Sequence, residues 1–211
     1  MSHSKQIQEI RDRARQHISD GAVTRDYALD RERAIAVLNE ALATELVCVL
    51  RYKFHYFMAT GIHSTAAKEE FLEHAGEEQQ HADQIAERIK QLGGKPEMNP
   101  ALIAGNAHSE YKEGTTLAEM LKEDLVAERI AIESYRDMIS FFGDKDTTTK
   151  RMLEEILAKE EEHADDIADL LFAQGENGDS RRLYYKDEVP GQSKAGQPVS
   201  DKADNAGKEK H

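Results

Sequence analysis

Two short motifs in this sequence have the residue types and the spacing of a metal site. Glu78 and His81 stand three residues apart, and Glu160 and His163 repeat that spacing later in the chain. On a helix, residues i and i+3 project from one face, so each pair can hold one cation. Carboxylate oxygen with imidazole nitrogen suits iron, manganese or zinc better than calcium. Each motif also lies within an apolar stripe of helical period, which is the face that packs inward.

Two further apolar stripes are each interrupted by a single glutamate. Glu45 follows Leu42, and Glu128 follows Leu125, at the spacing that keeps both residues on one helix face. Four carboxylates buried together would be prohibitively costly without compensation, whereas two divalent cations balance their charge. One such motif alone usually marks a solvated, salt-bridging face; two motifs with two partner glutamates favour metal. The sequence therefore predicts a two-cation site with the ligands Glu45, Glu78, His81, Glu128, Glu160 and His163.

Four long helices are predicted to carry these residues. Most predicted starts have a capping residue; Thr116 with Glu119, for example, forms a capping box. The predicted ends are marked by glycine, as at Gly143. The four helices are expected over residues 31–60, 64–92, 117–142 and 147–174, and a short leading helix is expected over 4–18.

The connections between these helices predict the topology. The first and second helices are joined by a few residues, as are the third and fourth, so each pair must be antiparallel. Residues 93–115 form a long connection that can span the length of the bundle, which makes the second and third helices parallel. The fold class is therefore all-α, a four-helix bundle of two antiparallel hairpins joined by a long crossover, with a short extra N-terminal helix.

Composition supports a helical protein that handles cations. The chain has 211 residues, 33% of them charged, four prolines, no tryptophan and a formal net charge of −13. An acidic surface argues against duplex binding, which needs Lys and Arg at the phosphates. Cys48 is the one cysteine, so neither an intrachain disulfide nor a paired-cysteine metal site is available. No secretory signal or membrane span is recognised, so we expect a cytoplasmic location and no membrane partner.

The chain divides into three predicted parts. Residues 1–29 form an N-terminal extension, 30–173 the four-helix bundle, and 174–211 a tail. The tail is rich in Gly, Ser, Asp and Lys with few apolar residues, so we expect it to be flexible. Because its acidic and basic side chains balance, a solvated tail is favoured over a DNA-binding one.

In four stretches the sequence resembles bacterioferritin and the Dps-like mini-ferritins. These are LNEALATELVCVLRY, EEQQHADQIAERIKQLGGKP, EDLVAERIAIESY and RMLEEILAKEEEHADDIADLL, and the resemblance covers residues 30–172. It implies a ferritin-like fold with a di-iron centre inside each subunit. Glu45 and Glu128 would be terminal ligands, Glu78 and Glu160 would bridge the irons, and one histidine would cap each iron. Tyr52 matches a tyrosine beside the family's centre, where it would hydrogen-bond a ligand or donate an electron.

Two departures from bacterioferritin bear on haem and on assembly. The family's haem-binding methionine directly follows the second-helix glutamate, and here that position is Gln79, so we expect no haem. Bacterioferritin also has a fifth helix that closes a 24-subunit shell, and no comparable apolar helix is predicted after Leu171. The resemblance therefore favours a 12-subunit Dps-like shell with a bacterioferritin-type site within each subunit.

The function implied is ferroxidation followed by iron storage, with Fe(II) and dioxygen or hydrogen peroxide as reactants. A rubrerythrin-like or manganese-catalase-like peroxide-scavenging enzyme remains an alternative, as does a non-catalytic, DNA-protecting Dps-like shell. Other residues on the second helix stay open. His74 is either an auxiliary ligand or a satisfied core histidine, and Glu73 and Glu77 either line a mineral cavity or form a solvated face.

Overall fold

The computed structural model describes residues 3–16, 18–62 and 64–173 of the chain, and every regular element in these ranges is a helix. Its elements, in chain order, are α1 (His3–Ala14), η1 (Ile18–Asp20), α2 (Arg31–Met58), α3 (Ser64–Gln91), α4 (Pro100–Asn106), α5 (Leu117–Phe142) and α6 (Thr147–Ala173). The predicted all-α class is confirmed. No helix within the described ranges combines the length and the apolar character needed to cross a membrane.

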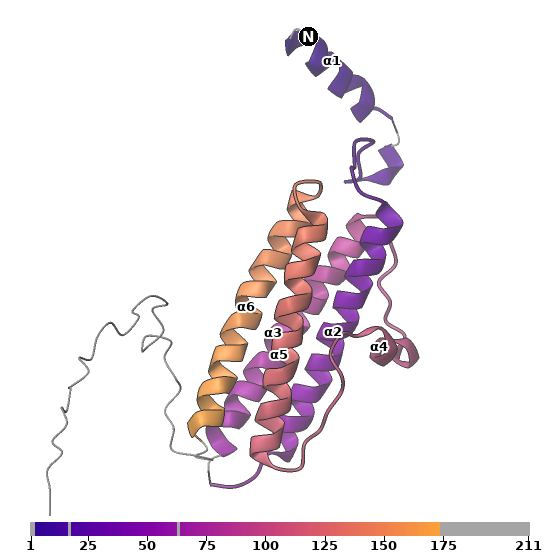
Figure 1. Cartoon of the computed structure of the whole chain (residues 1–211). Coiled ribbons are helices and arrows are strands. Elements are labelled where there is room, and N and C mark those ends of the chain that lie inside the picture. Colours follow the sequence, from indigo (N-terminus) through magenta and orange to yellow (C-terminus); the bar gives the residue numbers. More distant parts are fainter. Residues whose placement is uncertain (1–2, 17, 63, 174–211) are drawn as a thin grey trace, which may run out of the picture. The chain divides into compact units, whose positions relative to one another are not determined.

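The long helices α2, α3, α5 and α6 form the bundle in the predicted topology (Figure 1). α2 packs along α3 and α5 along α6, and the two hairpins meet through the pairs α3–α6 and α2–α5. α3 and α5 run in the same direction, as the long crossover between them requires (Figure 1). The structure agrees with the expected capping box, in which the Thr116 side chain accepts from the Glu119 backbone at the start of α5.

The crossover is held along the length of α2 by hydrogen bonds with three α2 side chains: Asn39 and Thr44 accept from backbone N–H groups of the crossover, and Arg51 donates to a backbone carbonyl. The crossover residues that make these bonds come in the same sequence order as their α2 partners. The crossover therefore runs beside α2 from the start of the helix toward its end. The bonds join Asn39 to the backbone of Glu97 at 2.8 Å, Thr44 to that of His108 at 2.9 Å and Arg51 to that of Glu110 at 3.2 Å.

Two details of the secondary structure differ from the sequence-based prediction. The crossover contains the seven-residue helix α4, which starts at Pro100 with Asn99 as its N-cap. An Asn-Pro pair is a helix-start signal, but seven residues carry too little periodicity to be recognised as a helix. The leading helix ends at Ala14 rather than at residue 18, and none of its residues is buried. The expected flexible tail and the absence of a fifth helix concern residues 174–211, which lie outside the described ranges.

A polar layer lies between two apolar layers in the bundle. One cluster of buried side chains includes Leu42 and Ile156, and the other includes Tyr52 and Ile167. Along α2 and along α6, the predicted ligands fall between the members of these clusters. The apolar layers therefore fix the helices on both sides of the polar layer and exclude water from it.

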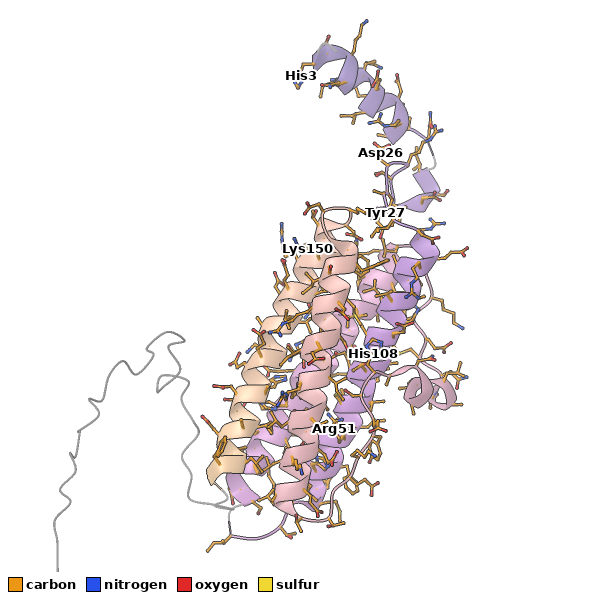
Figure 2. The ribbon with its side chains drawn as sticks, viewed as in Figure 1. His3, Asp26, Tyr27, Arg51, His108 and Lys150 are labelled. Carbon is orange, nitrogen blue, oxygen red and sulfur yellow. The ribbon has the colours of Figure 1, made fainter. Side chains whose placement is uncertain are left out.

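The Asp146 carboxylate joins three parts of the chain at one end of the bundle. It caps α6 by accepting from the Thr149 backbone at 2.9 Å, and it also accepts from Tyr27 Oη at 2.9 Å and Arg88 Nη2 at 3.0 Å. Tyr27 precedes α2 and is labelled in Figure 2. Burial raises the pKa of Asp146, but the hydrogen bonds from Thr149, Tyr27 and Arg88 lower it below its usual value.

We expect Asp146→Ala to lower the free energy of unfolding by about 2–3 kcal/mol, because a helix cap is lost and Arg88 loses its carboxylate. Because folding depresses the pKa of Asp146, its contribution should be present above the unfolded value and disappear as pH falls through the folded value. Urea unfolding at pH 7 and at pH 3 measures both effects. Asp144→Ala, at a fully exposed neighbouring position, is the control and should change little. Equal losses in the two variants at pH 7 would contradict the assignment.

Candidate metal centre

The six residues predicted as ligands lie together in the polar layer of the bundle. All six are buried, with exposures between 1% and 5%. They form two overlapping groups whose potential ligand atoms lie within 4.8 Å of one another. The groups are Glu45, Glu78, His81 and Glu160, and Glu78, Glu128, Glu160 and His163.

The two histidines face the cluster through their Nδ1 atoms. His81 Nδ1 lies 3.3 Å from Glu45 Oε2, 3.4 Å from Glu78 Oε2 and 3.0 Å from Glu160 Oε1. A cation bound to His81 Nδ1 could therefore also be bound by the carboxylates of Glu45, Glu78 and Glu160.

Glu78 and Glu160 are common to both groups, and each directs one oxygen to each histidine. His163 Nδ1 lies 3.5 Å from Glu78 Oε1 and 4.0 Å from Glu160 Oε2, which are the oxygens turned away from His81. Glu128 Oε2 completes this group at 3.9 Å. A carboxylate with one oxygen in each of two donor groups is suited to bridging two cations.

Unsatisfied polar atoms distinguish this cluster from a salt-bridge network. Each of the six residues has at least one buried oxygen or nitrogen without a hydrogen bond of acceptable geometry, and these atoms point at one another. Buried polar groups are nearly always hydrogen-bonded, so a converging set of unsatisfied atoms calls for a ligand. The mixture of carboxylate and imidazole donors fits iron, manganese or zinc.

Two buried tyrosines hold the outer glutamates. Tyr52 Oη donates to Glu128 Oε1, and Tyr135 Oη donates to Glu45 Oε1. Each bond crosses from one hairpin to the other and leaves the second oxygen of the carboxylate facing the cluster. Tyr52 was expected beside the centre, whereas Tyr135 was not among the site residues expected from the sequence. The sequence does contain a signal for Tyr135. It follows Glu128 by seven residues, as Tyr52 follows Glu45.

Burial and mutual repulsion shift the pKa values of the four carboxyl groups. Burial raises the pKa of Glu45, Glu128 and Glu160, and the negative charge of Glu78 raises each of them further. Glu78 shifts in the opposite direction: burial raises its pKa, but its close contacts with Glu45 and the two histidines bring it well below its usual value.

The three buried histidines of α3 and α6 differ in protonation. Burial lowers the pKa of His81, but its close contacts with the Glu45 and Glu78 carboxylates raise it to about 10. The pKa of His163 is likewise lowered by burial and raised, to about 9, by the carboxylates around it. At His74, burial and the charge of His163 outweigh the nearby Glu78 and Glu77 carboxylates and lower its pKa to about 3, so its imidazole is neutral.

We expect Glu45→Gln with Glu128→Gln to stabilise the metal-free protein by about 1–3 kcal/mol, because two costly buried carboxyl groups are removed. Glutamine oxygen can still accept from each tyrosine. Thermal melts with EDTA measure this, and Zn(II) should raise the melting temperature of the original chain by more than that of the variant, which has lost two core ligands. Glu133→Gln with Asp137→Asn, at exposed positions on α5, is the charge-matched control. A variant that melts lower than the original chain in EDTA would contradict the prediction.

The contacts of His163 bear on a residue whose role the sequence left open. Glu77 was expected either to line a mineral cavity or to form a solvated face, and its Oε2 lies 2.7 Å from His163 Nε2, the ring nitrogen opposite the cluster. Such a contact orients an imidazole and raises its basicity. Lys159 lies 3.4 Å from the other Glu77 oxygen. The equivalent side of His81 instead borders a cavity of about 260 Å³.

A second buried polar group was not recognised in the sequence. Asp124 accepts from Arg51 Nε at 2.8 Å, and its other oxygen lies 2.7 Å from His55 Nδ1. All three side chains are at most 1% exposed. Because Arg51 precedes Tyr52 and Asp124 lies one turn before Glu128, this ion group fixes the helices that carry the Tyr52–Glu128 contact. Figure 2 labels Arg51.

Comparison with known proteins places most of the chain in one family. The sequence model described as "Ferritin: Ferritin-like domain" matches residues 35–173, which include all six residues of the cluster. The chain is 31% identical over 146 residues to a bacterioferritin of Mycobacterium leprae, covering 69% of this chain and 87% of that protein. It is 32% identical over 139 residues to a "Nutrient stress-induced DNA-binding protein" of Synechococcus, covering 64% of this chain and 78% of that protein.

A solved structure supports the same placement. The structure described as a dodecameric thioferritin, the bacterioferritin-related protein of Bacteroides fragilis, matches with a TM-score of 0.68 and 34% identity. The match covers 70% of this chain and 89% of that one.

Proposed function

This chain belongs to the ferritin-like domain family, and from that membership we propose that it oxidises Fe(II) and stores the Fe(III) product as mineral within an oligomeric shell. The observation that carries the proposal is the convergence of buried, unsatisfied donor atoms from all four bundle helices. A storage protein without an oxidation site has no need for such a cluster at the middle of its core. The experiment that tests it follows the fate of added Fe(II).

Each residue of the cluster has a role in this proposal. Glu45 and Glu128 bind one Fe(II) each, while Glu78 and Glu160 bridge both, and the histidines complete the two donor sets through Nδ1. Metal binding needs neutral imidazole and ionised carboxylates, so loading releases protons from the cluster. The hydrogen bonds from Tyr52 and Tyr135 position the outer glutamates before metal arrives. Electron donation by Tyr52 stays a prediction.

The chemistry balances with either oxidant. Two Fe(II) ions give two electrons to one dioxygen, which takes up two protons and leaves as hydrogen peroxide. With hydrogen peroxide as oxidant, the two electrons and two protons produce two waters. The protein holds the two substrate ions together so that both electrons are available to one oxidant, and it keeps the surrounding core dry.

The cavity beside His81 is the best-supported access to the cluster. It has a volume of about 260 Å³ and is lined by Glu77, Gln80, His81, Gln84, Glu155, Ile156 and Lys159. His81 is the most exposed of the six residues, at 5%. An ion entering here meets the acidic side chains before it reaches the imidazole, and the route opens on the face formed by α3 and α6.

A shell of 12 subunits is the assembly we propose. Its support is the likeness to the Bacteroides fragilis protein, which is described as dodecameric. We do not extend the proposal to DNA binding, because a net charge of −13 opposes the approach of a phosphate backbone. The metal site does not depend on this assembly, because all six ligand residues come from one chain.

The metal-free protein, given two Fe(II) per chain under nitrogen and then dioxygen or peroxide, should form ferric species faster than buffer does. Further Fe(II) should remain soluble as an electron-dense core within a particle whose native mass is that of 12 chains. Iron that precipitates outside the protein at the rate seen in buffer would refute both steps. Rapid oxygen evolution from hydrogen peroxide by the manganese-loaded protein, without iron oxidation by the iron-loaded one, would instead identify a peroxide-scavenging enzyme.

A further inference from the structure

The donor cluster has an approximate twofold relation between the two hairpins. Glu45 on α2 corresponds to Glu128 on α5, and the Glu78-x-x-His81 motif on α3 to Glu160-x-x-His163 on α6. The tyrosines follow the same relation, each seven residues after one outer glutamate and bonded to the other. The residue types at corresponding positions of the two hairpins can therefore be compared. Positions where they differ indicate a function that only one hairpin has.

The two halves differ most on the face where α3 meets α6. Four and eight residues before Glu78 stand His74 and Glu70, and three residues after His163 stands Asp166. The corresponding positions, counted from Glu160 and His81, are occupied by Ile156, Met152 and Gln84. One side thus has three potential metal ligands where the other side has none that binds iron or zinc well.

Glu70, His74 and Asp166 lie close together in space. His74 Nε2 faces Glu70 Oε2 at 3.5 Å and Asp166 Oδ2 at 3.9 Å, and the three potential ligand atoms lie within 4.8 Å of one another. Two ligands of one ion, each about 2.1 Å from it, are separated by at most about 4.2 Å. The two measured separations fit within this limit, whereas both exceed the length of a good hydrogen bond.

His74 is the second, independent observation at this cluster. Its side chain is 2% exposed, and its Nε2 atom faces the two carboxylates at separations longer than a good hydrogen bond. The ring is fixed by stacking on His163 with centroids 4.0 Å apart, and by an edge contact with Tyr52. This packing aims Nε2 at the two carboxylates, which are themselves 35% and 47% exposed and so reachable from solvent.

We propose that Glu70, His74 and Asp166 form a third cation site, which binds one divalent transition-metal ion at the α3–α6 surface. Two carboxylates and a neutral imidazole balance the charge of one such ion, and the remaining positions stay open to water. The site is separate from the cluster in the core, and the stacked rings of His74 and His163 lie between them. In an iron-handling protein it is a place for an ion to wait on the way to or from the core.

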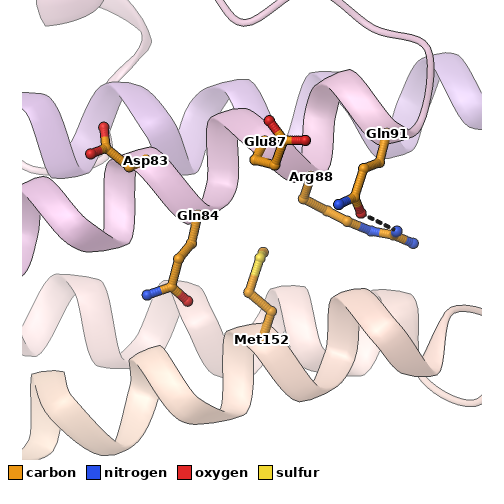
Figure 3. A pocket seen from close by; sticks show the side chains of 6 residues that line it. All are labelled: Asp83, Gln84, Glu87, Arg88, Gln91 and Met152. Atoms are coloured by element: carbon orange, nitrogen blue, oxygen red, sulfur yellow. Dashed lines mark hydrogen bonds between the residues drawn. The ribbon is translucent and has the colours of Figure 1, made fainter.

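Two of the corresponding positions, Gln84 and Met152, line a surface groove on the other half. Figure 3 shows Gln84, Arg88 and Gln91 with Met152 across from them, around a cavity of about 430 Å³. Asp83 and Glu87 also line this groove, but among the described residues no group of three potential metal ligands converges there, and the Arg88 guanidinium opposes a cation. The proposed site therefore has no counterpart at the corresponding positions of α3 and α6.

Equilibrium dialysis of the metal-free full chain against Co(II) under nitrogen tests the proposal, with metal analysis as readout. We expect three Co(II) per chain, and two in Glu70→Gln with Asp166→Asn, whose side chains are not buried. Glu73→Gln, an exposed neighbour on α3, is the control and should keep three. Crystals of the Co(II) protein should show an anomalous peak bounded by His74 Nε2 and the two carboxylates.

The third site rests on the proposed function only for the identity of the ion. Separate variants test the third site and the core site, so either one can be refuted without the other. Glu45→Gln with Glu128→Gln should lose the two core ions but keep the third. If that variant binds as much Co(II) as the original chain, the core site is refuted. If Glu70→Gln with Asp166→Asn binds as much as the original chain, or if the anomalous map has no peak beside His74, the third site is refuted.

Discussion

Glu128→Ala and His163→Ala should each slow the rapid oxidation of Fe(II) by more than about 100-fold while leaving helical content nearly unchanged. Loss of a residue that only orients a metal ligand typically costs 10–100-fold in affinity or activity, so loss of a ligand should cost more. The two residues come from different helices, α5 and α6, and both face the same donor group. Stopped-flow absorbance after mixing Fe(II) protein with dioxygen measures the rate, and circular dichroism measures the helical content.

Glu161→Ala is the matched control for this experiment. It removes a carboxylate next to Glu160 on the same helix, but its side chain is 49% exposed and pairs with Arg136 at the surface. Because only Glu160 has the spacing that faces the cluster, the control should oxidise Fe(II) at the original rate. Original rates in both ligand variants, or an equal loss in the control, would remove the basis for the site.

Asp124→Asn should lower the free energy of unfolding by about 3–5 kcal/mol, because it leaves the buried Arg51 guanidinium without a counter-charge. Asparagine keeps the shape and one acceptor oxygen, so the effect comes from the lost charge rather than from a cavity. Urea unfolding followed by circular dichroism measures it. Asp137→Asn, at an exposed position on the same helix, should change the free energy by less than about 0.5 kcal/mol.

A second variant separates the ion pair from other causes. Replacing a buried pair with apolar residues of similar volume is often neutral, whereas removing one partner is not. We therefore expect Arg51→Met with Asp124→Leu to unfold at higher urea than Asp124→Asn alone. If the double variant is the less stable of the two, the loss in Asp124→Asn arises from packing around α5 and not from an unpaired charge.

The bundle and the cluster could be predicted because both depend on helical periodicity. The spacing of Glu78 and His81 within an apolar stripe places them inward before any contact is known, and the short and long connections determine which helices are antiparallel. The ends of the long helices also followed local signals, such as the capping box at Thr116. These features require only the residues within a few turns of one another.

The contacts between hairpins could not be predicted, because their partners are distant in the chain. Arg51 and Asp124 are 73 residues apart, and each alone looks like a surface charge on a helix. Glu77 lies beside the inward stripe, and its side chain reaches His163, 86 residues away. His74 was left open between a core histidine and an auxiliary ligand because the positions of Glu70 and Asp166 around it depend on how α3 packs against α6.

The crossover between α3 and α5 has a consequence for the order in which the protein folds. Each hairpin consists of contacts that are local in sequence, so each can form early, whereas joining the hairpins requires closing the long loop between them. Each hairpin carries only half of the donor cluster, two carboxylates and one histidine. In the absence of cations, the two halves bring their negative charges together at this last step. Metal ions should thus act late in folding, by favouring the docked state over separate hairpins, and hydrogen exchange at the α3–α6 contact should slow more than exchange within either hairpin when they bind.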